Sequence, residues 1–311
     1  MDRLKLLSAE FMFMRPPAPP PKKFTIKEPG ELLAWLAANV PGLTRTEAKS
    51  LLRHGAIRVN GETAARHDVA LKAGDKVEVS NAAAGRAAAR PLPFPILFED
   101  DHLVVIDKPS GLLTVGTETE KQRTAHRLLG ERERARGNPL GRVFVVHRLD
   151  RETSGIVIFA KTEQAKRKLQ DKWDSVEKEY FAVVEGVPSP EEGTLVHWLQ
   201  EDQGGFRVHA SEEKNRFGEK ATTHYRVVSK RDRRALLHVR IDTGKKHQIR
   251  VQLAAIKTPV VGDERYGTGR KAPRLGLHAT KITFKHPATG KMLTVESPLP
   301  AVLQKLVGQQ D

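Results

Sequence analysis

One aspartate lies in a polar segment between two apolar, strand-like runs. Residues 143–161 read VFVVHRLDRETSGIVIFAK, so β-branched residues flank a segment whose single aspartate is Asp150. A plain turn between strands needs one polar side chain of the Asx type, whereas this segment also carries His, Arg, Glu, Thr and Ser. Taken alone, the window supports two interpretations equally: Asp150 forms a turn, or it is the catalytic carboxylate of a functional loop.

Motifs of several other enzyme classes are missing from the sequence. There is no cysteine, which excludes thiolate metal sites and cysteine nucleophiles. The 12 histidines form no HExxH pair, and neither glycine–lysine pair, at 244–245 and 290–291, is followed by the Ser or Thr of a phosphate-binding loop. We therefore expect no metal and no cofactor.

The composition favours a protein that binds nucleic acid. Of 311 residues, 53 are Lys or Arg and 38 are Asp or Glu, which gives a formal net charge of +15. Such a balance is typical of proteins that bind polyanions. No apolar run approaches the ~20 residues of a membrane span, and the N-terminus lacks the apolar core of a secretory signal. We expect a cytoplasmic monomer that binds nucleic acid and no membrane.

Changes in composition along the chain predict four segments. Residues 1–29 contain the run PPAPPPKK and are expected to form a flexible, proline-rich arm. A small folded module is expected over residues 30–80, and a linker over residues 81–95, which read NAAAGRAAARPLPFP. Residues 96–311 are long enough for a main domain with its own core.

The small module shows two helical patterns followed by short strands. In the second helix, Arg45, Lys49 and Arg53 recur every four residues and therefore line one exposed face. Such a face is often simply solvated, but a cluster of three cations can also contact phosphates. The stretch TRTEAKSLLRHGAIRVNGE, followed by LKAGDKV, resembles an S4 RNA-binding domain, which is a small α/β module. The resemblance implies that these three cations bind RNA.

The segment around Asp150 resembles the signature of a known family. HRLDRETSGIVIFAK is similar to the HRLD-x-x-TSG motif of the RluA-type pseudouridine synthases, and KPSG at 108–111 is similar to the motif that precedes it there. Three later blocks agree in order: KEYFAVVEG, TGKKHQIRVQLAAIKTPVVGDERYG and LGLHATKITFKHPATG. The resemblance extends over about residues 96–296 and implies an α+β fold with a mixed, mostly antiparallel sheet flanked by helices.

The resemblance also implies an activity, the isomerisation of specific uridines in RNA to pseudouridine without a cofactor. An S4 domain ahead of this catalytic domain is familiar in members that act on large-subunit (23S) ribosomal RNA. That RNA is therefore the expected substrate, and tRNA is the alternative one. A competing interpretation is a non-catalytic S4-type RNA-binding or ribosome-assembly protein, which would keep its role without Asp150.

Three residues are expected to perform the chemistry. A carboxylate such as Asp150 can attack covalently, or it can stabilise positive charge at the anomeric carbon. An enclosed carboxylate that must stay ionised needs a fixed cation, and the resemblance assigns that role to Arg250. It also implies that the ring of Tyr180 stacks on the uracil. Without the resemblance, Arg250 would be interpreted as an exposed helical cation and Tyr180 as a core residue.

Two further residues are expected to form the substrate pocket. The resemblance implies that Leu277 is an apolar wall. Arg148 precedes Asp150 by two residues and would share its face of an extended strand, where a guanidinium can fill the gap left by an extruded uridine. The sequence departs from the family pattern at Lys245, Gln252 and Lys257, and we expect these changes to alter local RNA contacts only.

Overall fold

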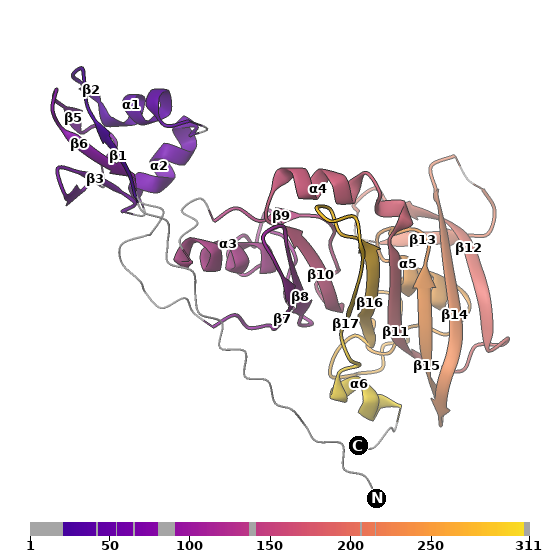
Figure 1. The fold of residues 1–311 in the computed structure, drawn as a ribbon. Helices are drawn as coiled ribbons and strands as arrows, with labels where there is room; N and C mark the ends of the chain where they lie inside the picture. Colours follow the sequence, from indigo (N-terminus) through magenta and orange to yellow (C-terminus); the bar gives the residue numbers. More distant parts are fainter. Residues whose placement is uncertain are drawn as a thin grey trace, which may run out of the picture. The chain divides into compact units, whose positions relative to one another are not determined.

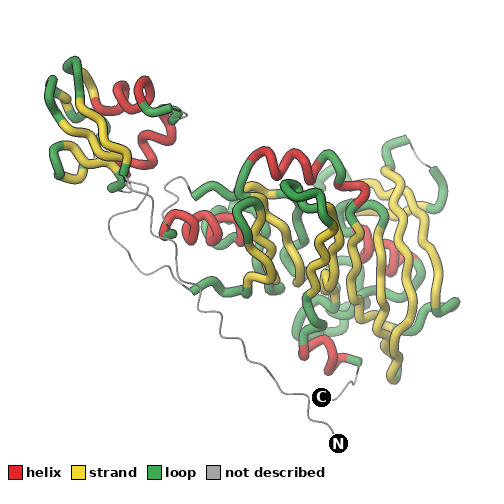
Figure 2. Tube along the Cα trace, viewed as in Figure 1, coloured by secondary structure: helices red, strands yellow, loops and turns green. Residues whose placement is uncertain are grey.

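The computed structural model describes most of the chain as two compact units, drawn in Figures 1 and 2. Among the described residues, 21–79 make up most of the first unit, and 91–131 with 142–307 make up the second. No helix in the described residues is long and apolar enough to cross a membrane. The described ranges are 21–41, 43–53, 55–64, 66–79, 91–136, 141–205, 207–214 and 216–307.

The first unit packs two helices against a small antiparallel sheet. Its helices are α1 (Leu32–Asn39) and α2 (Arg45–Arg53), and its sheet has the order β1-β6-β3-β4. Leu33 and Leu36 of α1 and Leu52 of α2 are buried in one core with the sheet, so both predicted helices are confirmed. The strands are β1 (Lys22–Thr25), β3 (Ile57–Val59), β4 (Glu62–Thr63) and β6 (Lys76–Val79), with β2 (Gly30–Glu31) paired to β5 (Ala70–Leu71).

Part of the predicted arm, residues 1–29, belongs to the folded first unit. Residues 22–25 form β1 and pair with β6, and Ile26 is buried. Phe24 packs edge-on against Trp35 with ring centroids 5.5 Å apart. The last proline of the run, Pro21, precedes β1, and the apolar side chains of Phe24 and Ile26 pack this stretch onto the module. Residues 1–20 lie outside the described residues.

Part of the predicted linker, residues 81–95, belongs to the folded second unit. Residues 81–90 lie outside the described residues, but 91–95 belong to the second unit. Phe94 is buried in its core, and the backbone of Pro95 accepts a hydrogen bond of 3.1 Å from the N–H of Asp107. An aromatic side chain among three prolines thus anchors the start of the second unit, because its burial removes apolar area from water.

The second unit is built on an eleven-stranded sheet with the main order β13-β12-β14-β15-β11-β16-β10-β8-β7. All pairs are antiparallel except β10 with β16, which confirms the mixed, mostly antiparallel sheet. Its strands are β7 (Ile96–Glu99), β8 (Leu103–Lys108), β9 (Phe144–Val145), β10 (Ser154–Ala160), β11 (Glu177–Glu185), β12 (Glu192–Glu201), β13 (Val208–Ser211), β14 (Glu219–Arg231), β15 (Arg234–Ile241), β16 (Leu277–Lys285) and β17 (Met292–Glu296).

Helices cover both faces of this sheet (Figure 1). Alternation along β11 separates the two sides: Tyr180 faces the cores of α3 and α5, whereas Phe181 faces the core of α6. The confirmed α+β architecture therefore places Tyr180 on the face that α5 covers. The helices are α3 (Ala125–Ala135), α4 (Glu163–Gln170), α5 (Gln248–Ala255) and α6 (Ala301–Leu306), with a 3₁₀ turn at Trp173–Ser175.

The parallel junction of β10 and β16 requires glycine at position 155. Gly155 has a φ of +113°, and a Cβ there would lie 2.2 Å from the carbonyl oxygen of Ala279. No other residue allows the two backbones to approach so closely. The TSG part of the motif thus brings the start of β10, just after Asp150, beside Leu277 at the start of β16.

A directed chain of hydrogen bonds joins β8, β10 and β16 beneath this junction. Arg274 donates to Ser154 Oγ at 2.5 Å, and Ser154 Oγ lies 2.8 Å from Nδ1 of His278. Nε2 of His278 lies 3.1 Å from Ser297 Oγ, which donates to Asp107 at 2.9 Å. The direction from cation to carboxylate makes Nδ1 the acceptor and Nε2–H the donor, so His278 is neutral. Burial lowers the pKa of His278 to about 4.

We expect the stability of the second unit to fall in mild acid because of His278. The folded pKa is about 4 and the unfolded value is about 6.5, so the folded state binds fewer protons and loses stability as pH drops below 6.5. Between pH 7.5 and pH 5 the wild type should lose ~2 kcal/mol more unfolding free energy than His278→Gln does. Urea unfolding at both pH values measures this, and equal losses in the two proteins would contradict a neutral, buried His278.

Candidate active site

Asp150 lies in a loop at the start of β10. The strand expected before it is only two residues long, Phe144–Val145, so residues 146–153 form a loop and the prediction of an extended strand through Arg148 and Asp150 is wrong. The reason is the polar composition of this segment, which has few side chains to bury on a sheet. Arg148 and Asp150 nevertheless line the same cavity.

Two side chains hold the backbone on both sides of Asp150. The ammonium of Lys108 is fully buried and donates to the carbonyls of Pro109, Leu112 and Arg151 at 3.1, 2.8 and 3.2 Å. Thr114 Oγ1 donates to the carbonyl of Leu149 and accepts from its N–H. The loop that carries Asp150 is therefore pinned at the residue before it and at the residue after it.

Lys108 is held in its charged form by those carbonyls. Burial lowers the pKa of Lys108 to about 7, and the negative charge of Asp150 works against that shift. Three carbonyl oxygens need three N–H donors, which only the ammonium form has. The geometry thus favours a protonated Lys108 near neutral pH, and its charge lies behind the loop.

Arg250 is clamped between two carboxylates. Its Nε and Nη2 donate to Asp263 at 2.7 and 2.8 Å, and its Nη1 donates to Oδ2 of Asp150 at 3.2 Å. The side chains of Arg250 and Asp263 are 3% and 0% exposed, whereas that of Asp150 is 25% exposed. Burial disfavours the charged guanidinium, but Asp263 and then Asp150 outweigh burial and raise the pKa of Arg250. A permanent positive charge is therefore fixed beside Asp150.

The helix that carries Arg250 docks as its apolar pattern predicts. Ile249 and Leu253 of α5 pack with Tyr225 and Leu237 of the sheet, which holds the arginine stem against the core. Gln252, one of the departures from the family pattern, is fully buried and donates to the carbonyls of Leu195 and Ala221 at 3.2 Å. Gln252 therefore anchors α5 on the sheet. The prediction that this departure alters RNA contacts is wrong for Gln252, because its side chain is buried.

His247 and Tyr266 border the same ion pair. His247 is the N-cap residue that precedes α5. Its backbone is in the left-handed conformation, with φ at 52°, and its Nε2 lies 3.9 Å from Oδ2 of Asp150. Nδ1 of His247 lies 2.9 Å from the hydroxyl of Tyr266, which also accepts the N–H of Val208. Because the hydroxyl oxygen of Tyr266 accepts from Val208, its O–H can donate to Nδ1 of His247. In the neutral imidazole the proton then sits on Nε2, which faces Asp150. Burial lowers the pKa of His247, although Asp150 opposes the shift.

A small recess of about 80 Å³ lies between the ion pair and the sheet. Asp150 and Arg250 line it together with Tyr180, Leu277 and Arg148. Burial, and then the charge of Asp150, raise the pKa of Tyr180, so the side chain stays a neutral phenol. It can stack on a ring or share its proton, but it is no anionic base at neutral pH.

The recess adjoins a larger cavity of about 570 Å³, with which it shares Arg148, Asp150 and His247 in its lining. Its lining includes five cationic side chains, which are those of Arg148, Arg151, Lys245, Lys246 and Arg265. Lys246 pairs with Glu201 at 2.6 Å, and Lys245 with Glu219 at 2.5 Å. Within the described residues, no group of three His, Cys, Asp or Glu side chains could hold a metal ion.

The structure brings five of the predicted site residues together and reveals three that sequence reasoning missed. Asp150, Tyr180, Arg250, Arg148 and Leu277 all line the recess, whereas Arg45, Lys49 and Arg53 are exposed on α2 of the other unit. The missed residues are Lys108, His247 and Asp263, and each lies inside a block that carries the family resemblance. The signal that could have identified them was a polar residue inside a block that resembles the family, namely KPSG, KKHQIR or GDERYG.

Comparisons with known proteins agree with this fold. The family model described as RNA pseudouridylate synthase matches residues 102–255, the stretch from β8 through α5 that carries Asp150, Tyr180 and Arg250. A solved structure, Human RNA Pseudouridylate Synthase Domain Containing 4, matches with a TM-score of 0.56 and 26% identity over 67% of this chain and 89% of that chain. Fold and site together define an RNA pseudouridine synthase.

Curated relatives extend the match over most of the chain. Ribosomal large subunit pseudouridine synthase D of Xanthomonas campestris pv. campestris is 32% identical over 296 residues, which cover 88% of this chain and 87% of the relative. The Uncharacterized RNA pseudouridine synthase YhcT of Bacillus subtilis is 30% identical over 90% of this chain and 93% of the relative. The chain belongs to the RluA-type RNA pseudouridine synthases and is an isomerase.

Asp263→Asn is expected to destabilise the second unit through Arg250. The amide keeps the shape of the carboxylate but loses its charge, which leaves a buried guanidinium with Asp150 as its only anion. Removing one partner of a buried ion pair costs roughly 3–5 kcal/mol, and we expect the lower end because Asp150 remains. Urea unfolding measures the loss. The control is Glu264→Gln, a change at an exposed neighbour, which should alter the unfolding free energy by less than about 0.5 kcal/mol. Similar losses in both variants would show that the Asp263–Arg250 ion pair does not stabilise the unit.

Proposed function

We propose that this enzyme isomerises specific uridines of large-subunit (23S) ribosomal RNA to pseudouridine. A curated relative that matches most of this chain is named for the large ribosomal subunit, and this supports ribosomal RNA over tRNA, the alternative substrate. The net charge of +15 suits a polyanionic partner. We further propose that the enzyme works in the cytoplasm as a monomer and needs no cofactor.

The reaction rearranges bonds within one nucleotide. The C1′–N1 glycosidic bond breaks, a C1′–C5 bond forms, and a proton moves from C5 to N1, so no outside reactant is needed. In the proposed mechanism Asp150 is the carboxylate that attacks covalently or stabilises charge at C1′. The observation that carries this assignment is the 3.2 Å bond from the buried Arg250 to Asp150, because it fixes a cation beside a half-open carboxylate.

The remaining residues of the recess are proposed to handle the base. The neutral phenol of Tyr180 would stack on the extruded uracil and exchange protons with it, and Leu277 would form the opposite apolar wall. Extrusion of a base costs a few kcal/mol, and Arg148, exposed at the mouth of the recess, would fill the gap that the base leaves in the RNA.

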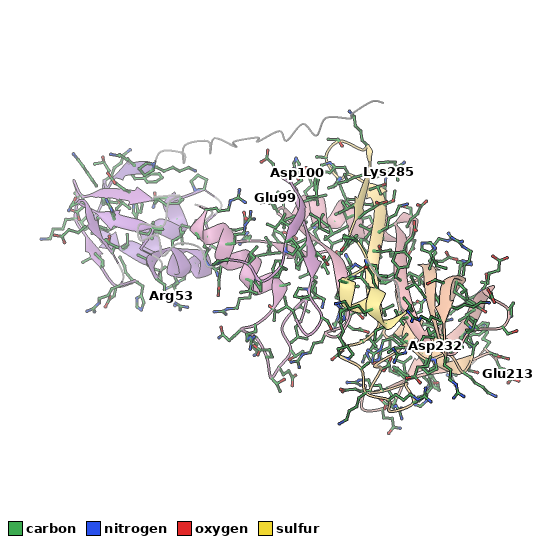
Figure 3. All side chains as sticks on the ribbon, turned by 90° about the horizontal axis from the view of Figure 1, so that it is seen from below. Arg53, Glu99, Asp100, Glu213, Asp232 and Lys285 are labelled. Carbon is green, nitrogen blue, oxygen red and sulfur yellow. The ribbon has the colours of Figure 1, made fainter. Side chains whose placement is uncertain are left out.

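The first unit is proposed to be an S4-like RNA-binding domain. Its helix α2 presents Arg45, Lys49 and Arg53 on one exposed face, and its opposite side is buried in the core through Ala48 and Leu52. Figure 3 labels Arg53 at the end of this helix. Cations presented in this way position a protein on phosphates and carry no information on the base sequence.

A non-catalytic RNA-binding or ribosome-assembly role is the other function to test. A binding surface gains nothing from a carboxylate placed 3.2 Å from a buried arginine, since a carboxylate does not attract phosphates. The complete recess around Asp150 therefore favours the enzyme. The two functions differ in what happens when only this carboxylate is altered.

Asp150→Asn is expected to abolish isomerisation and leave RNA binding nearly unchanged. The amide has almost the same size as the carboxylate but no charge and little nucleophilicity. Pseudouridines would be mapped in cells that lack the protein and in the same cells supplied with the wild type or the variant. Sites in 23S RNA should return with the wild type alone. If the variant also restores those pseudouridines, Asp150 is not the catalytic residue. If the restored pseudouridines lie in tRNA, the substrate is tRNA and not 23S RNA.

Neutralising the α2 cations is expected to weaken binding without slowing the chemical step. If Arg45, Lys49 and Arg53 each contact a phosphate, changing all three to Gln should lower the slope of log affinity against log salt by about 0.7–0.9 per contact. Single-turnover isomerisation at saturating RNA should keep its rate. The matched control changes three other exposed cations of the same unit, Lys27, Lys72 and Lys76, to Gln. The S4-like role fails if the two triple variants show the same slope.

A further inference from the structure

A second basic cavity lies at the opposite end of β15 from the active site. The turn between β14 and β15 borders it together with α6, and Arg234 donates to the carbonyl of Leu306 at 3.2 Å. Figure 3 labels Asp232 in this turn, near the yellow helix α6. The cavity has a volume of about 500 Å³ and is lined by Glu185, Arg231, Asp232, Arg233, Arg234, Arg270, Lys305 and Leu306.

Cations outnumber anions in this basic cavity. Five positive side chains face two carboxylates, those of Glu185 and Asp232, and Leu306 is the single apolar residue in the lining. The carboxylate of Glu185 already accepts a hydrogen bond from the hydroxyl of Thr268, which offsets part of its negative charge. An organic ligand normally needs an apolar lining, whereas an anion needs donors and positive charge.

Three of these cations are available to an outside anion. Arg233, Arg270 and Lys305 are exposed, and within the described part of the chain none of their side chains has an ion-pair or hydrogen-bond partner. Cations elsewhere on the unit are commonly paired: Arg167 with Glu163, Lys245 with Glu219 and Lys246 with Glu201. Three exposed cations without such a partner therefore lie around one cavity.

The backbone under these side chains is fixed. The carbonyl of Arg233 accepts the N–H of Gly186 at 2.7 Å, and the β14–β15 register pairs Arg231 with Arg234 across the turn. On the other side, Leu303 of α6 is fully buried against the sheet, so Lys305 projects from an anchored helix. Cations held in place by a rigid scaffold lose less freedom on binding than cations on a mobile tail.

We propose that this basic cavity binds the sugar–phosphate backbone of the RNA substrate at nucleotides that flank the target uridine. Arginine forks suit phosphate oxygens, and three unpaired cations offset the charge of successive phosphates. The proposal rests on the proposed function, since it takes the modified RNA as the ligand. It assigns to the second unit a phosphate-binding surface of its own, separate from α2.

The distance to the recess fits flanking nucleotides and excludes the target base. Glu185 lies five residues further along β11 than Tyr180, which is roughly 17 Å at about 3.3 Å per residue, and its side chain points to the opposite face of the sheet. A third cavity of about 610 Å³ has Arg250, Arg265 and Arg274 in its lining, together with Val302 of α6. It shares α6 and the 262–275 loop with the basic cavity, so positive side chains continue from behind Arg250 to the β14–β15 turn.

The test compares two triple variants of the full-length enzyme. The first changes Arg233, Arg270 and Lys305 to Gln. The control changes Lys220, Arg226 and Arg240 to Gln, which are exposed cations on β14 and β15 outside the cavity. Both remove the same charge from exposed positions, and circular dichroism melting curves establish that both variants fold. The probe is a 23S RNA transcript, titrated at several salt concentrations and followed in single-turnover isomerisation at saturating RNA.

We expect the cavity variant to bind the transcript about 10-fold more weakly, with a salt slope reduced by roughly 2, and the control to stay within twofold of the wild type. The single-turnover rate should be unchanged in both. Equal slopes in the two variants, or a wild-type slope in the cavity variant, would overturn the inference. Absence of turnover by the wild type would instead refute the 23S substrate, and the slopes would still report on the cavity.

Discussion

The guanidinium of Arg250 ties the catalytic loop to the rest of the second unit. It donates two hydrogen bonds to Asp263, at 2.7 and 2.8 Å, and one hydrogen bond to Asp150, at 3.2 Å. A bidentate bond fixes the orientation of the planar group, so the position of Arg250 does not depend on Asp150. Within the described residues, Oδ1 of Asp150 has no hydrogen-bond partner. The carboxylate therefore gains a fixed counter-charge and keeps one oxygen available to the substrate.

A loop holds this carboxylate where a strand was expected, which requires the loop itself to be rigid. Thr114 binds both backbone groups of Leu149, and Lys108 binds the carbonyl of Arg151, so both neighbours of Asp150 are fixed. Gly155 then lets β10 approach β16 closely and sets the distance from the loop to Leu277. Sites held in this way keep the geometry that catalysis needs, although the catalytic residue itself is outside regular structure.

Local sequence patterns predicted the helices and strands of this fold better than they predicted the tertiary contacts between side chains. The helix around Ile249 and Leu253 and the two faces of β11 followed from periodicity and alternation. The strand at Lys22–Thr25 was missed because a proline-rich run beside it dominated the composition of that stretch. Asp263 was missed for a different reason: its bond to Arg250 exists only because the chain turns back after α5, and no local pattern encodes that return.

The distribution of charge around the recess separates the base from its phosphates. Inside, Asp150 and Asp263 both bond to Arg250, and the ammonium of Lys108 lies behind the Asp150 loop, so the buried charges largely balance. At the mouth, five cations line the larger cavity against two carboxylates other than Asp150. Phosphates are therefore attracted to the mouth, where the cations outnumber the carboxylates, whereas an uncharged base gains little from those cations. The placement of the cations thus favours a bound RNA whose backbone stays at the mouth while the base enters the recess.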